Sequence, residues 1–105
     1  MREFDLIIAN EIGLHVRPAG LLAEAASKFV SDITVSSNGK DADGKAMFHM
    51  MTLGARHGDS VHFSIIGPDE EEAETVLFKV AKKALGPEEG IAPKEKEHYV
   101  DPFSI

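Results

Sequence analysis

One histidine of this chain stands in a stretch whose residue types could hold a phosphoryl group. In order, the stretch comprises Gly13, Leu14, His15, Val16, Arg17, Pro18 and Ala19. Proline is tolerated in the first turn of a helix, so Pro18 predicts a helix that begins beside His15. The amides and the positive dipole end at a helix start attract anions. A phosphate on His15 would be held by the backbone of Val16 and Arg17, and we predict that His15 is a phosphorylated nucleophile.

His15 and Arg17 have complementary chemistry for such a transfer. The positive end of a helix disfavours the imidazolium form, which leaves a ring nitrogen lone pair able to attack phosphorus. Arg17 adds a permanently charged, planar donor that offsets charge on the phosphoryl oxygens. Gly13 permits a turn close to His15. A single histidine before a helix is more often a cap or a surface residue, so the prediction depends on the combination of these residues.

Composition excludes several other classes of function. The 105 residues are 43% hydrophobic and 28% charged, which fits one globular domain. A formal charge of −7 disfavours nucleic acid and anionic membranes as partners. No cysteine is present, so a disulfide or a thiolate metal site is excluded, and the spacing of His49, His57 and His62 matches no metal motif. We expect a cytoplasmic monomer with no membrane insertion, no metal and no cofactor.

Apolar periodicity and turn residues together predict seven elements in the order β, α, β, β, α, β, α, of which the third strand is short and polar. Strands are expected at residues 4–8, 33–37, 41–44 and 61–65, with a tight turn at Asn38 and Gly39. Helices are expected at residues 18–29, 47–53 and 68–85. An α+β fold buries these stripes most simply, as an open-faced β-sandwich with a four-stranded antiparallel sheet and three helices on one face.

The composition changes after Gly86, where Gly, Pro, Lys and Glu dominate. We therefore predict a domain at residues 1–86 and a charged tail at residues 87–105. A solvated tail is the simplest interpretation of that composition. The apolar residues at the end of the tail could instead dock on the domain or on a partner, and the sequence leaves this open.

These residues resemble a known family, the histidine-containing phosphocarrier protein HPr of the phosphoenolpyruvate-dependent sugar phosphotransferase system. The resemblance covers about residues 3–86 and adds two motifs to the one around His15: Ser37, Asn38, Gly39 and Lys40, and then Lys45 with Thr52, Leu53 and Gly54. It implies that His15 accepts phosphate on its pros nitrogen from phosphorylated enzyme I and passes it to a sugar-specific enzyme IIA. Such a phosphocarrier is a transfer intermediate rather than an independent enzyme, and the family fold agrees with the predicted order of elements.

The resemblance also implies a docking face around His15, formed by Gly20, Leu21, Met47, Phe48 and Met51. Flexible methionine side chains suit a surface that meets several partners. Because a short helix buries at most one side, we expect Met50 and Leu53 inside, with Met47, Phe48 and Met51 at least partly exposed.

The sequence departs from the family pattern at several positions. Ala46 stands where many members carry a regulatory serine, so that phosphorylation is chemically impossible here. Glu24, Ser27 and His49 stand where basic residues are common, which changes the charge offered to a partner. These departures leave open a regulatory relative whose phosphorylated form controls transcription or nitrogen use. A non-catalytic protein-binding module also stays open, because small α+β folds host many functions.

Overall fold

The predicted order of elements is confirmed by a computed structural model of the chain, which describes residues 1–87. The strands are β1 (Arg2–Ile7), β2 (Asp32–Ser37), β3 (Lys40–Asp43) and β4 (Ser60–Ile66). The helices are α1 (Val16–Ala26), α2 (Met47–Met51) and α3 (Glu70–Leu85). Apart from Pro87, the predicted tail lies outside the described residues, so the boundary at residue 86 stays a prediction.

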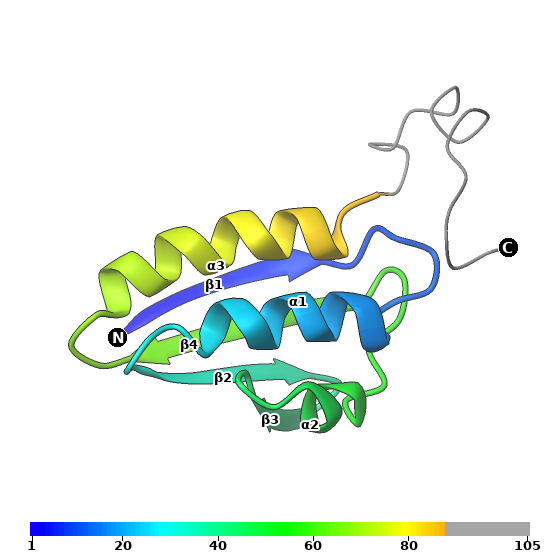
Figure 1. Cartoon of the computed structure of the whole chain (residues 1–105). Helices are drawn as coiled ribbons and strands as arrows, with labels where there is room; N and C mark the ends of the chain where they lie inside the picture. The colour runs from blue at the N-terminus through cyan, green and yellow to red at the C-terminus, as the bar shows by residue number, and fades with distance from the viewer. Residues whose placement is uncertain (88–105) are drawn as a thin grey trace, which may run out of the picture.

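The four strands form one antiparallel sheet in the order β1-β4-β2-β3. Helices α1 and α3 lie side by side over one face of this sheet, and α2 lies beside β3 (Figure 1). Along β4, Val61, Phe63 and Ile65 are buried beneath the helices, while the residues between them point to the other face. The predicted open-faced sandwich is therefore confirmed.

The two long helices pack on the sheet mainly through alanine and leucine side chains at helical spacing. In α3, the buried positions are Ala73, Leu77, Ala81 and Leu85, which recur every four residues. Under this helix, the ring of Phe4 in β1 stacks on that of Phe63 with 4.6 Å between centroids. The C-terminal end of α3 lies beside the N-terminal end of α1 (Figure 1), and His15 is the residue that directly precedes α1. Within residues 1–87, no helix has the length and apolar character needed to cross a membrane.

The predicted bounds of the first helix were wrong at both ends. Helix α1 begins at Val16, so Pro18 is its third residue. Proline is compatible with this position because the first N–H with an acceptor inside the helix is that of Ala19, which donates to the carbonyl of His15 at 3.0 Å. The helix ends at Ala26, and Phe29 is buried in the turn that follows it rather than in the helix.

An imidazole on the open face of the sheet gives a testable pH dependence. His62 contacts Asp5 through Nδ1 at 2.8 Å and Glu3 through Nε2 at 2.9 Å, and the hydrogen bond to Asp5 is the main reason that the pKa of His62 is raised above 6.5. The folded state therefore favours protonated His62. The resulting stabilisation of the fold is complete below the pKa of His62 in the unfolded chain, and it is lost as the pH rises through the pKa of His62 in the folded chain. It is modest, because the side chain is 37% exposed.

We expect the Tm difference between the natural chain and His62→Gln to be largest near pH 6 and to shrink as the pH rises, as measured by thermal unfolding across a pH series. Titration of the His62 ring by NMR checks the cause. A pKa at or below 6.5, or a Tm difference that grows with pH, would contradict this interpretation.

Candidate functional site

His15 is the N-cap residue of α1, but its side chain does not serve as the cap. Its backbone is extended, with φ −101° and ψ −168°, and no side-chain capping hydrogen bond forms. Within residues 1–87 the ring has no hydrogen-bond partner and is half-buried. The interpretation of His15 as an ordinary capping residue is therefore wrong. The imidazole lies at the positive end of α1 without a hydrogen bond to residues 1–87.

At residue 13, the loop before His15 adopts a backbone conformation that favours glycine. Gly13 has φ +95°, and a Cβ atom built there would lie 2.6 Å from the carbonyl oxygen of Ala55. That same oxygen accepts a hydrogen bond from the amide of Leu14 at 3.0 Å, and the amide of His15 donates to the carbonyl of Gly13 at 3.0 Å. Close contact with the segment at Ala55 therefore determines where the chain enters α1.

The predicted phosphate-binding residues lie at the start of α1. Val16 and Arg17 are the first two helical residues, and both are exposed. Backbone N–H groups at these positions point toward the N-terminal end of a helix, where His15 stands. The guanidinium of Arg17 adds positive charge two residues from the imidazole. This arrangement has the chemistry to hold an anion beside the ring.

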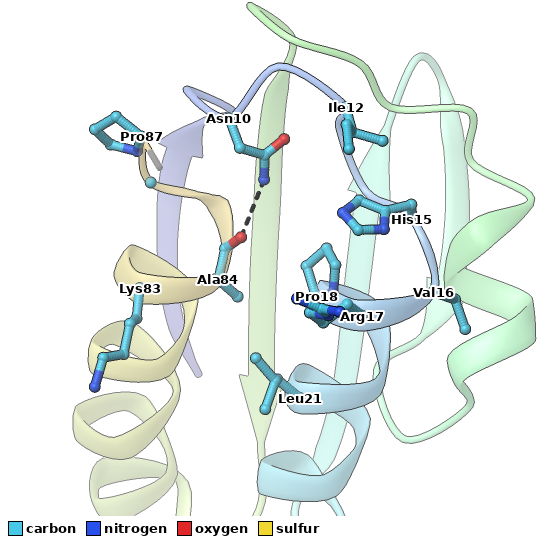
Figure 2. A pocket seen from close by; sticks show the side chains of 11 residues that line it. Asn10, Ile12, His15, Val16, Arg17, Pro18, Leu21, Lys83, Ala84 and Pro87 are labelled. Carbon is cyan, nitrogen blue, oxygen red and sulfur yellow. Dashed lines mark hydrogen bonds between the residues drawn. The ribbon is translucent and has the colours of Figure 1, made fainter. Parts of the chain in front are cut away.

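The His15 pocket is a hollow of about 590 Å³ between the start of α1 and the end of α3. Figure 2 shows the ring of His15 projecting into it between Ile12 and Pro18. Its lining comprises Asn10, Ile12, His15, Val16, Arg17, Pro18, Leu21, Lys83, Ala84, Gly86 and Pro87. Arg17 and Lys83 bring positive charge to this part of an acidic chain, and Ile12 and Leu21 are 64% and 45% exposed. A pocket of this kind suits an anionic group presented by another protein.

The predicted docking residues lie on two adjacent helices. A Cβ atom built on Gly20 in α1 would lie 3.3 Å from the sulfur of Met47 in α2, so the two helices meet there. Phe48 is 72% exposed, and Met47 and Met51 are partly exposed. Met50 and Leu53 are buried, as the sequence predicted. Of the predicted docking residues, Leu21 lines the pocket together with His15, and the role of the five residues in docking stays a prediction.

The sequence motifs missed six pocket residues: Asn10, Ile12, Lys83, Ala84, Gly86 and Pro87. They come from the loop after β1 and from the end of α3 with the two residues that follow it, which are distant in sequence. Of these residues, only Asn10 gave a signal in the sequence, as a polar residue directly after an apolar strand.

Ala46 is the N-cap residue of α2 and forms no side-chain cap. Among residues 1–87, no three His, Cys, Asp or Glu side chains are grouped so as to hold a metal ion.

Comparison with known proteins gives consistent matches. A family model described as the PTS HPr component phosphorylation site matches residues 2–83. The phosphocarrier protein HPr of Vibrio cholerae is 45% identical over 73 residues, which is 70% of this chain and 86% of that protein. The phosphocarrier protein HPr of Mycoplasma genitalium is 40% identical over 74 residues, which is 70% of this chain and 84% of that protein.

Solved structures agree with these matches. An HPr structure from Thermoanaerobacter tengcongensis has a TM-score of 0.74 at 40% identity, covering 82% of this chain and 97% of that chain. A histidine-containing phosphocarrier protein of Mycoplasma has a TM-score of 0.77 at 33% identity, covering 80% of this chain and 97% of that chain. The matched region includes the whole sheet, α1, α2 and the loop that presents His15. The chain therefore belongs to the HPr family, the phosphocarriers of the phosphotransferase system.

Proposed function

We propose that this phosphocarrier accepts its phosphoryl group on a ring nitrogen of His15, from phosphorylated enzyme I, and passes it to a sugar-specific enzyme IIA in the cytoplasm. One observation supports this most: the half-buried ring of His15 has no hydrogen-bond partner among residues 1–87 and projects into a pocket at the positive end of α1. The proposed chemistry uses no metal and no cofactor of the chain's own.

The transfer proceeds in two displacements at phosphorus. In the first, the ring nitrogen lone pair attacks the phosphorus held by enzyme I, a P–N bond to His15 forms, and the donor keeps the electron pair of the bond that breaks. In the second, a histidine of enzyme IIA attacks, and the P–N bond to His15 breaks. The amides of Val16 and Arg17 and the Arg17 guanidinium stabilise charge on the phosphoryl oxygens in both steps.

The proposal is tested by incubating the chain with phosphoenolpyruvate and the cognate enzyme I, followed by intact mass measurement. We expect the mass to rise by one phosphoryl group and to return to its starting value when the cognate enzyme IIA is added. No rise in mass would reject the proposal. A rise that no enzyme IIA reverses would reject the transport role and favour the regulatory alternative.

The docking face yields a separate prediction. We expect Phe48→Ala to raise the Kd for enzyme I about tenfold, because aromatic side chains at the centre of an interface contribute about 1–2 kcal/mol. Folding stability should be unchanged, since Phe48 is 72% exposed. Isothermal titration calorimetry measures the Kd. Val30→Ala is the matched control, because Val30 is 75% exposed and follows the opposite end of α1. Equal Kd values for the two variants would contradict the predicted docking face.

A further inference from the structure

Asn10 is a buried polar residue beside the His15 pocket, and nothing in the transfer chemistry uses it. It is 3% exposed, and the other buried polar residues of the described chain, Ser31 and Ser37, lie elsewhere in the fold. A buried amide is costly unless both its donor and its acceptor have partners. Asn10 satisfies both: Oδ1 accepts from the amide of Gly13, and Nδ2 donates to the carbonyl of Ala84 at 3.0 Å (Figure 2).

These two hydrogen bonds join segments that are far apart in the sequence. Ala84 belongs to the last turn of α3, where the carbonyl groups receive no hydrogen bond from an N–H group of the same helix. The backbone amide of Asn10 also donates to the neighbouring carbonyl of Leu85 at 3.2 Å. Gly13 lies two residues before His15. One side chain therefore connects the end of α3 to the loop that presents the imidazole.

The same loop has a second contact through Asn10. The carbonyl of Asn10 lies 3.0 Å from Nδ1 of His57, and the amide of Leu14 donates to Ala55 in the same segment. The loop before His15 is thus held between the segment at residues 55–57 and the end of α3. Of these contacts, the bond from Nδ2 to Ala84 is the side-chain link to α3, and α3 also contributes Lys83 to the pocket.

We propose that Asn10 is a positioning residue for phosphoryl transfer, which fixes the ring of His15 relative to the pocket by linking Gly13 to the last turn of α3. The inference rests on the proposed function of His15. Transfer between two proteins requires in-line geometry, and a displacement of about 1 Å at the reacting atom can reduce the rate about 100-fold. Asn10 does not contact phosphate and is not a catalytic residue.

Two substitutions separate the hydrogen bonds of Asn10. Asn10→Asp has nearly the same shape and keeps the acceptor for Gly13, but an ionised carboxylate cannot donate to Ala84. Asn10→Ala removes both bonds. Ser37→Ala is the control, since it removes a buried hydrogen bond from Ser37 Oγ to the carbonyl of Ser60 at 2.8 Å, on the sheet.

Steady-state phosphorylation by enzyme I is measured for each variant at a temperature where all are folded. We expect kcat to fall about tenfold in Asn10→Asp and about 100-fold in Asn10→Ala. The KM for the chain should be unchanged, because the docking face is intact, and Ser37→Ala should keep the natural kcat. Exchange of the Gly13 amide, measured by NMR, should accelerate in Asn10→Ala and stay slow in Asn10→Asp.

An unchanged kcat in both Asn10 variants, or an equal loss in Ser37→Ala, would overturn the inference and leave His15 as the acceptor. A natural chain that gains no phosphate would overturn the proposed function itself. The two failures are distinguishable, since the first is seen only in variants of a chain that is phosphorylated.

Discussion

Replacing His15 with alanine is expected to abolish phosphorylation by enzyme I. The ring nitrogen is the proposed nucleophile, and removing a nucleophile reduces a rate by far more than about a thousandfold. The loss should not come from unfolding. The ring makes no hydrogen bond within residues 1–87, so the free energy of unfolding should change by less than about 1 kcal/mol. Intact mass after incubation with phosphoenolpyruvate and enzyme I gives the phosphorylated fraction.

A second histidine provides the matched control. His62→Gln also removes an imidazole, but from the open face of the sheet, on the side opposite the helices. It should be phosphorylated at the natural rate. Full phosphorylation of His15→Ala would show that another residue carries the phosphoryl group. An equal loss in His62→Gln would show that the loss is not specific to His15, and would also contradict the prediction.

Gly13→Ala is expected to produce the second largest effect, because two costs coincide at this position. Its φ of +95° is strained for alanine, and the added Cβ would lie 2.6 Å from the oxygen of Ala55 and 3.0 Å from the Cα of Arg56. Both neighbours are backbone atoms, so the loop must shift. We expect a loss of about 3 kcal/mol in the free energy of unfolding, the sum of backbone strain and overpacking. The phosphorylation rate of the folded protein should fall about 100-fold.

Gly54→Ala separates strain from displacement. Gly54 also has a positive φ, +64°, but nothing lies within 4 Å of a Cβ atom built there. This control should lose about 1–2 kcal/mol from strain alone and keep the natural phosphorylation rate. Urea unfolding gives the free energies, and initial rates are measured where both variants are folded. A Gly13→Ala protein that is as stable and as active as Gly54→Ala would contradict the role assigned to the loop.

The element order was predictable because most strands and helices have a clear apolar period, and because the turn at Asn38 and Gly39 indicates the short polar strand β3. The residues at which the helices begin and end were less predictable. Phe29 continues the spacing of α1 but is buried in the turn after it. Asp69 is the N-cap residue of α3, but its carboxylate accepts hydrogen bonds from the amides of Val30 and Ser31 at 2.9 and 3.0 Å rather than capping the helix. Such contacts join residues about 40 positions apart, so no local pattern contains them.

The candidate site was predictable only in part, because some of its residues are also far apart in the sequence. His15, Arg17 and Pro18 are close in sequence, and their chemistry is apparent from type and spacing. Asn10 and Lys83 reach the same pocket from the loop after β1 and from the end of α3. Their contribution depends on α1 and α3 lying side by side on the sheet (Figure 1), which is a property of the tertiary fold.

The most direct test of the account is to locate the phosphoryl group on the natural chain. After incubation with phosphoenolpyruvate and enzyme I, fragmentation of the intact phosphoprotein by mass spectrometry under mild conditions identifies the modified residue. The account predicts one phosphoryl group, on the imidazole of His15. A phosphoryl group on any other residue, or none at all, would contradict it.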